Sequence, residues 1–419
     1  MTSIAYAALW LFVFVLPWEG VIRIGGTAIA SRATGVLAIG CTMFAVLLSG
    51  RIRRLGMLHI SALLFVLSAG IELFVYHAGD RLPNKYFTFV QLLLVLWMIW
   101  QLCPTRQRIN NLFLAFVAGC YVSSFLTMLL LRSSGGNLNR YAAGGVDPND
   151  LAMTLALALP CAWYLASTYH RPLLIWVTRG YIPVGIVAIG LTGSRGGLLT
   201  SVLALSIVPL TMTRLSPKRM VTMMVMLFLA GGLAVAYVPE KIVERLATTS
   251  SEVEDMKAGG RIKMWKAGFE VYPQHPILGF GTSGFVRAVT PVLGSEALVA
   301  HNSFISILVE EGIIGLSLYL LMFVAVYRGV RRLPRFERRF GLVLLGTLLL
   351  AMTPLTWEDQ KPVWFVLAAL MGFASTRVIP ATTGARPARP MPTGRPLVGG
   401  PITRRPPASV AAPPGDAGT

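Results

Sequence analysis

Long apolar runs recur along this chain of 419 residues and constrain its fold more than any other feature. A helix needs roughly 17–25 mostly apolar residues to cross the hydrocarbon core of a membrane. Helices also satisfy their own backbone hydrogen bonds in lipid, so we predict an all-α polytopic membrane protein with about 12 transmembrane helices. The predicted spans are 4–18, 34–49, 55–77, 85–103, 109–131, 150–169, 173–191, 196–213, 219–238, 303–328, 339–356 and 361–377.

The composition agrees with a membrane protein. Hydrophobic residues make up 55% of the chain and charged residues 13%, against about 25% charged residues in soluble domains. The first span lacks a basic leader and a small-residue cleavage site, which indicates a retained helix rather than a signal peptide. The four cysteines lie in or beside spans without C-x-x-C spacing, so neither a disulfide framework nor a cysteine metal site is predicted.

The basic residues are distributed unevenly between the two faces of the membrane. A net charge of +19 could suggest a nucleic-acid partner, but the loops after even-numbered spans and the tail hold 21 basic residues, against 8 in the short loops of the other face. Cytoplasmic loops are enriched in Lys and Arg. We therefore predict cytoplasmic termini, a bacterial inner-membrane location and no nucleic-acid partner.

A long polar interval and a change of composition near residue 378 divide the chain into four parts. We predict helices 1–9 over residues 1–238, a loop with short helices over 239–302, helices 10–12 over 303–377, and a disordered cytoplasmic Pro/Arg-rich tail over 378–419. The loop far exceeds the usual 2–8 residue connection of a helical bundle, which favours a function for it. With the predicted topology this loop faces the periplasm.

Two shorter outer loops each end in residues that can cap the helix that follows. In "DPND", Asp147, Asn149 or Asp150 can cap a helix that starts at Leu151. In "GSRGG", Ser194 can cap the eighth span. Arg195 then lies at a helix N-terminus, where backbone N–H groups already favour an anion.

The long loop adds a second arginine. Arg261 follows two glycines and precedes "IKMWKAGFEVY", which predicts a short amphipathic helix with Ile262, Trp265 and Phe269 on one side. A surface arginine without a role is the alternative. Together, Arg195 and Arg261 could bind phosphate oxygens through bidentate guanidinium hydrogen bonds.

Histidines and carboxyl groups complete the candidate site. His301 and Asn302 open the tenth span, where a neutral imidazole could act as a general base or could simply belong to a helix cap. His275 precedes a proline in a glycine turn, which favours a structural role over a catalytic one. Glu310 and Glu311 lie deeper in that span. They either face the bundle interior, or "EEG" breaks the helix there.

Motifs for other chemistries are absent from the sequence. It has no D-x-D, H-E-x-x-H, G-x-S-x-G or Walker motif, so we predict no metal site and no cofactor. The outer carboxyl groups of Asp147, Asp150, Glu358 and Asp359 do not have a spacing that argues for ion binding.

The order of these motifs resembles the bacterial O-antigen ligase family, within the ligase/polymerase superfamily. "DPND-LA", "GSRGG", "R-x-x-x-W", "HPILGFG" and "HNSFISILVEEGIIGL" carry the resemblance. It implies a GT-C-like membrane glycosyltransferase that transfers glycan from undecaprenyl diphosphate to lipid A-core, among membrane lipids and without metal or nucleotide. By motif, His301, Arg195 and Arg261 resemble the essential residues of the family. We expect Asn302 and His275 to lie among the substrate-binding residues.

Other functions remain open from sequence alone. An O-antigen polymerase or a protein O-oligosaccharyltransferase would share donor and reaction, although the single long outer loop favours a ligase. A transporter or flippase would place its polar features near the membrane midplane, whereas the candidate residues here gather at one face.

Overall fold

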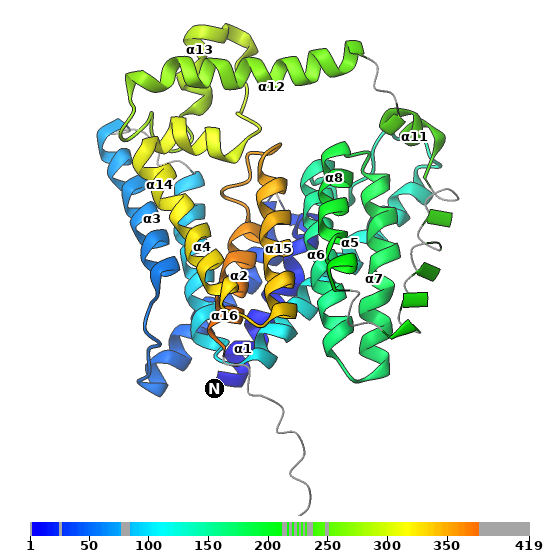
Figure 1. The fold of residues 1–419 in the computed structure, drawn as a ribbon. Helices are drawn as coiled ribbons and strands as arrows, with labels where there is room; N and C mark the ends of the chain where they lie inside the picture. Colours follow the sequence, from blue (N-terminus) through cyan, green and yellow to red (C-terminus); the bar gives the residue numbers. More distant parts are fainter. Residues whose placement is uncertain are drawn as a thin grey trace, which may run out of the picture. The chain divides into compact units, whose positions relative to one another are not determined.

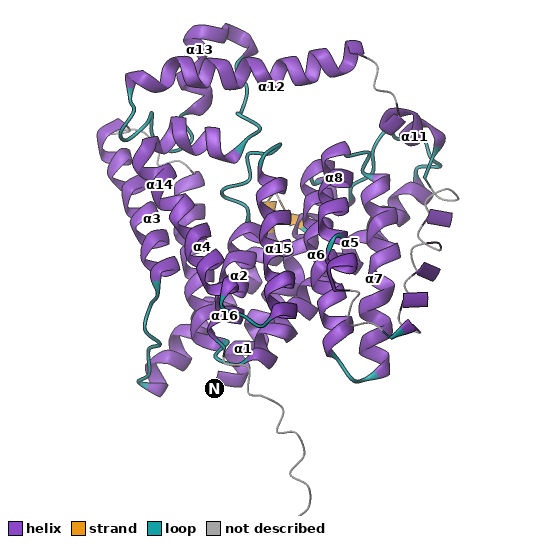
Figure 2. Cartoon of the chain, viewed as in Figure 1, coloured by secondary structure: helices purple, strands orange, loops and turns teal. Residues whose placement is uncertain are grey.

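The computed structural model describes residues 2–24, 27–76, 84–211 and 251–376, together with parts of 216–247. The described chain is helical apart from a small hairpin, in which β1 (Arg23–Ile24) pairs antiparallel with β2 (Thr27–Ala28) (Figure 2). Residues 1–377 form one compact unit. The tail predicted over 378–419 lies outside the described residues.

Seven described helices are long and apolar enough to cross a membrane. They are α1 (Thr2–Val15) with η1 (Leu16–Val21), α2 (Ile29–Ser49), α4 (Asn84–Leu102), α5 (Arg106–Ser133), α6 (Pro148–Thr168), α7 (Pro172–Leu191) and α14 (Ser303–Arg331) (Figure 1). The predicted class, a polytopic α-helical membrane protein, is confirmed.

Other helices occupy four more of the predicted spans. These are α3 (Met57–Tyr76), α8 (Arg195–Leu205) with α9 (Ile207–Thr211), α15 (Arg335–Met352) and α16 (Lys361–Ser375). The span predicted over 196–213 corresponds to α8 and α9, which follow one another at Ser206 and together form an apolar helical segment over Arg195–Thr211. Most of the ninth predicted span, 219–238, lies outside the described residues, so the total of twelve stays a prediction.

Large apolar side chains cover the outside of these helices. On α2, Val36 and Leu47 are 72% and 76% exposed. Soluble monomers rarely expose large contiguous apolar patches, whereas lipid solvates them without penalty. The exposed apolar surface therefore fits hydrocarbon rather than water.

The core of the bundle forms around α6, which packs against α5, α7, α8 and α15. Gly197 permits a close approach, because a Cβ there would stand 2.4 Å from the Cβ of Ala152. Towards the other end of α6, Tyr164 stacks on Phe340 of α15 with ring centroids 4.3 Å apart. Small and flat side chains thus set how closely α6 meets its neighbours.

A layer of helices, of which α12 is the longest, follows the predicted ninth span. It consists of α11 (Glu240–Ala247), α12 (Ser251–Val271), η4 (Tyr272–Gln274), α13 (Phe285–Leu293) and η5 (Gly294–Glu296). In Figure 1, α12 runs across the end of the bundle, with α13 beside it. Met264, Ala267 and Val271 of α12 form a small core with Phe285 of α13 and Val309 of α14.

The prediction for α12 is partly wrong. The helix begins ten residues before Arg261 and contains it. Ile262 and Phe269 are exposed. Trp265 is partly buried and packs against the core that Met264, Ala267 and Val271 form. Both sets have the same helical spacing, so the pattern alone does not choose between them. The flexible methionine and the small alanine suit the close contact with α13 and α14.

Candidate active site

His301 lies directly before α14 in an unusual backbone conformation. Its φ of +47° falls in the left-handed region that non-glycine residues rarely adopt. Its backbone N–H donates to Thr356 Oγ1 at 3.0 Å. Asn302 is the cap of α14, since its side-chain oxygen accepts from the N–H groups of Phe304 and Ile305. His301 is therefore held by the α15–α16 loop rather than serving as the cap itself.

The imidazole of His301 is partly buried between charges of opposite sign. Burial lowers the pKa of His301 from its ordinary value of 6.5, the Arg261 guanidinium lowers it further, and the Asp147 carboxylate opposes both. The imidazole is therefore neutral at pH 7, the form that a general base requires. The structure thus brings together two of the three residues predicted to be catalytic, His301 and Arg261.

Arg195 is the first residue of α8, within a polar cluster at the α6–α8 junction. Ser194 caps α8 by accepting from the N–H of Gly197 at 3.2 Å, as predicted. Its hydroxyl donates to Asn149 Oδ1 at 2.9 Å, and Arg140 Nη2 donates to the same oxygen at 2.7 Å. Arg140 is thereby placed near Arg195, a neighbour that the sequence did not indicate.

The α6 side of this junction is also capped. Asp147 accepts from the N–H of Asn149 at 2.7 Å, and α6 begins at Pro148 rather than at Leu151. Of the three predicted capping residues, Asp147 is therefore the one that caps. Its carboxylate also reaches the electrostatic surroundings of His301.

The loop between α15 and α16, residues 353–360, contacts both the start of α8, where Arg195 lies, and His301. At one end, a Cβ on Gly196 would stand 3.7 Å from Pro354 Cγ, so this loop lies against the start of α8. Further along, Thr356 accepts the hydrogen bond from His301. Residues 353–360 therefore place the N-terminus of α8 and His301 around one shared segment.

Two serines of α14 fasten this loop. Ser303 Oγ donates to the carbonyl of Leu355 at 2.9 Å and accepts from the N–H of Trp357 at 2.8 Å. One turn further, Ser306 Oγ donates to Glu358 Oε1 at 2.9 Å. The loop cannot shift without breaking bonds to the helix that follows His301.

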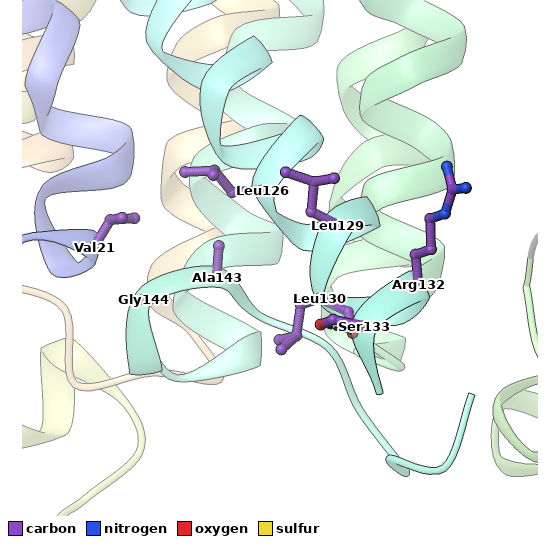
Figure 3. Close-up of a pocket in the computed structure, with 8 residues that line it drawn as sticks. All are labelled: Val21, Leu126, Leu129, Leu130, Arg132, Ser133, Ala143 and Gly144. Carbon is purple, nitrogen blue, oxygen red and sulfur yellow. Dashed lines mark hydrogen bonds between the residues drawn. The ribbon is translucent and has the colours of Figure 1, made fainter. Parts of the chain in front are cut away.

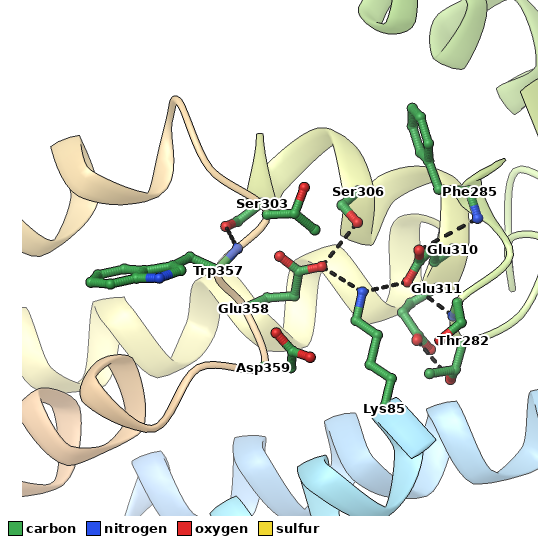
Figure 4. A network of polar contacts seen from close by, with 12 residues as sticks. Lys85, Thr282, Phe285, Ser303, Ser306, Glu310, Glu311, Trp357, Glu358 and Asp359 are labelled. Atoms are coloured by element: carbon green, nitrogen blue, oxygen red, sulfur yellow. Dashed lines mark hydrogen bonds and ion pairs between the residues drawn. The ribbon is translucent and has the colours of Figure 1, made fainter. Parts of the chain in front are cut away.

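A buried network of ion pairs also holds the 353–360 loop in place (Figure 4). Lys85, at the start of α4, lies 2.5 Å from Glu358 Oε1 and 2.7 Å from Glu310 Oε2. Burial raises the pKa of the adjacent Asp359 carboxyl, an effect that Lys85 opposes. One ammonium thus holds together α4, α14 and the loop, which we call the Lys85 network.

The long loop joins α14 where that helix breaks. Gly312 has φ +63° and ψ −167°, so α14 is interrupted at "EEG". This break is one of the two alternatives that the sequence offered for Glu310 and Glu311. The freed carbonyls of Val309 and Glu310 accept from the N–H groups of Phe280 and Gly281, at 2.9 and 2.8 Å. We call this contact of "HPILGFG" with "VEEG" the loop–helix bridge.

Glu310 and Glu311 face the protein interior, as the other expectation stated. They are 4% and 1% exposed. Glu310 Oε2 accepts from the N–H of Ser283, and Glu311 Oε1 accepts from Thr282 Oγ1 at 2.8 Å. These carboxyl groups continue the Lys85 network into the loop–helix bridge.

His275 belongs to the turn that begins the loop–helix bridge. Its carbonyl accepts from the N–H of Gly279 at 2.9 Å, and its ring packs edge-on against Phe280 with centroids 4.6 Å apart. These contacts fit the structural role expected for His275. Substrate contacts of His275 and Asn302 stay predictions.

The sequence indicated Glu310 as a residue of the site but not its partners Lys85 and Glu358. Lys85 is one of the eight basic residues of the outer loops, and the spacing of Glu358 does not indicate a partner. A usable signal was present, because charges inside or beside membrane spans pair with one another. Which charges pair could not be read from spacing along the chain.

Two cavities that the described residues form lie near ends of the helices. One is an apolar groove of about 430 Å³ along α5, lined by leucines such as Leu126 and Leu129, with Arg132 at its edge (Figure 3). Contact with membrane lipid is enough to explain it. The other, of about 240 Å³, is polar and includes Asp147 and Asp150 in its lining.

These features define a multi-pass helical membrane protein whose arginines, histidine and buried carboxyl groups converge around one loop. Residues 181–320, which contain Arg195, Arg261 and His301, match the family model described as O-antigen ligase. This match supports the resemblance to O-antigen ligases that the sequence motifs indicated, and with it a membrane enzyme of the ligase/polymerase type in lipopolysaccharide biosynthesis. No curated protein matches the chain.

Proposed function

We propose that this protein is an inverting glycosyltransferase that moves an O-antigen glycan from undecaprenyl diphosphate onto a sugar hydroxyl of lipid A-core. The observation that carries the proposal is the position of His301. It lies within electrostatic reach of Arg261 and bonds to the loop that also meets the start of α8, where Arg195 lies. A neutral base with a guanidinium group near it, and the start of the helix that carries Arg195, thus meet at one loop.

The reaction follows from these groups. The acceptor hydroxyl gives its proton to the neutral imidazole of His301, and its oxygen forms a bond to the anomeric carbon. The bond from that carbon to the diphosphate breaks, and its electron pair leaves with the diphosphate. Arg195 and Arg261 stabilise the negative charge of this leaving group. Displacement from the opposite side inverts the anomeric carbon, and no metal or nucleotide takes part.

We further propose a GT-C-like bundle of twelve transmembrane helices in the bacterial inner membrane. Residues 1–238 and 303–377 supply the helices, 239–302 form the periplasmic part and 378–419 a cytoplasmic tail. Contacts such as Lys85–Glu358 and Lys361–Glu19 support the topology. They join segments that the distribution of basic residues assigns to one face.

Two related transferase activities are the second candidate function. A polymerase or a protein O-oligosaccharyltransferase would use the same donor and the same residues, and the acceptor alone separates them. A transporter is less well supported. Arg195 and His301 stand at helix starts rather than in the middle of spans, where transporters place their sites.

Substitutions of the three residues test the proposal. With purified protein, lipid-linked glycan and lipid A-core, we expect Arg195→Ala and Arg261→Ala to remove most conjugate formation. Lysine should rescue poorly because it lacks the bidentate fork. His301→Ala should lower turnover by at least about 10²-fold while donor binding persists, since the base is not a phosphate ligand.

The control is Lys263→Ala, an exposed cation on α12 close to Arg261 in sequence. All variants must first elute and unfold like the parent protein. A well-folded His301→Ala protein with near-normal turnover would show that His301 is not the base. Loss of donor binding in that variant would instead move His301 into the phosphate site.

A further inference from the structure

The polar cavity beside α6 is lined by side chains that have no part in the proposed binding of the diphosphate. It has a volume of about 240 Å³, below the roughly 300–1,000 Å³ of pockets that hold drug-sized ligands. Its size suits one sugar ring rather than a lipid diphosphate. The polar and aromatic side chains in its lining are Glu19, Arg23, Asp147, Asp150, Trp357 and Gln360.

This cavity adjoins the proposed base. Asp147 lines it and lies close enough to His301 for their charges to interact. Trp357 lines it as well, and follows Thr356, the residue that accepts from the backbone N–H of His301. A ring bound in the cavity can therefore present a hydroxyl towards His301.

Acidic groups outnumber basic groups in the lining. Three carboxyl groups face one guanidinium, Arg23, which also donates to the carbonyls of Gly20 and Gly145. Glu19 is paired with Lys361 at 2.6 Å. Asp147 and Asp150 remain as the carboxyl groups that a ligand meets. Both can form hydrogen bonds with hydroxyl groups, and the carboxylate of Asp147 repels anions.

His301 thus lies near groups of opposite charge. The guanidinium of Arg261 and the carboxylate of Asp147 both interact with its imidazole, and Asp147 also lines the cavity. A donor diphosphate is attracted to the first group and repelled by the second. A neutral polyol has the reverse preference, because it gains hydrogen bonds to carboxylates and loses nothing to charge repulsion.

We propose that this cavity binds the uncharged acceptor sugar, with Asp150 and Gln360 accepting and donating hydrogen bonds to its hydroxyl groups. This inference rests on the proposed glycosyl transfer. It adds a specificity: the accepted unit is a neutral sugar, and a uronic acid or a phosphorylated sugar is rejected at this position.

The test compares Asp150→Asn and Gln360→Ala with Thr353→Ala, an exposed residue of the same loop outside the cavity. We measure initial rates against lipid A-core at saturating donor, and against donor at saturating acceptor. The two cavity variants should raise the acceptor KM about fivefold to tenfold, the loss of about one hydrogen bond. Their donor KM, and both constants of Thr353→Ala, should stay unchanged.

A binding experiment without donor separates this inference from the proposed reaction. Ligand-observed NMR with the intact protein in detergent should show a methyl hexoside binding and a methyl hexuronide not binding. Asp150→Asn and Gln360→Ala should lose the hexoside signal, and Arg195→Ala should keep it. Equal signals from hexoside and hexuronide, or an unchanged acceptor KM in both cavity variants, would overturn the cavity assignment. Normal hexoside binding without glycosyl transfer would overturn the proposed function alone.

Discussion

At the scale of single residues, His301 combines a strained backbone conformation with a partly buried side chain. The left-handed conformation is held by one hydrogen bond from its N–H to Thr356. Strain of about 1–3 kcal/mol at such a position persists only where the surroundings fix it. The sequence indicated the helix start and the chemistry of His301. It could not indicate Thr356, which is 55 residues away and carries no motif.

The pH dependence of turnover should report the charges around His301. Because its folded pKa is lowered, the imidazole is neutral above that pKa, and the rate should fall only when the pH drops through a value below 6.5. Arg261→Gln removes a positive charge and should move this acid limb to higher pH. Asp147→Asn removes a negative charge, keeps the helix cap, and should move the limb to lower pH.

The measurement is the pH profile of kcat/KM, compared by the midpoint of the acid limb rather than by its height. Thr353→Ala serves as the unshifted control. Shifts of both variants in one direction, or none in either, would mean that a group other than His301 titrates.

At the scale of elements, the site depends on contacts between segments that are distant in the chain. Lys85 and Glu358 are 273 residues apart. Hydropathy predicts that both regions border membrane spans, but most spans are apolar on every side, so the pattern does not say which spans are neighbours. The Lys85 network was for that reason unpredictable from a single sequence, although helix ends and caps were largely predictable from local chemistry.

Removal of Lys85 should damage folding far more than removal of a surface lysine. Lys85→Met leaves the buried carboxyl groups of Glu310 and Glu358 without their cation, which typically costs about 3–5 kcal/mol. Lys263→Met breaks an exposed pair with Glu296 and should cost less than about 1 kcal/mol. Thermal unfolding in detergent measures both. Comparable small losses would argue that the Lys85 network contributes little.

Gly312 should be the least replaceable glycine of α14. A Cβ there would stand 2.2 Å from the carbonyl oxygen of Ile277, and its φ of +63° disfavours any side chain. Gly312→Ala should therefore lower the unfolding temperature markedly. Gly346→Ala in α15 is the matched control, because its nearest neighbour would be 3.9 Å away. That change should be neutral or stabilise by about 0.5–1 kcal/mol, and similar losses in both would contradict the loop–helix bridge.

At the scale of the whole molecule, the proposed topology is open to a direct labelling experiment. Single cysteines replace Ser251, before the loop–helix bridge, and Ser409, in the tail. Three of the four native cysteines are buried, and the partly exposed Cys41 can be changed to serine. In cells with a permeabilised outer membrane, an impermeant thiol reagent should label position 251 and spare 409. Labelling at 409 with protection at 251 would invert the topology.

The loop–helix bridge also bears on how the protein is made. A helix broken at Gly312 exposes carbonyl groups that lipid cannot satisfy, so α14 is unsuited to enter the bilayer alone. Its partner segment, residues 276–281, precedes it in the chain and is synthesised first. This segment has therefore already been made when α14 leaves the ribosome. The segment that satisfies the free carbonyl groups of α14 is thus synthesised before the helix that carries them.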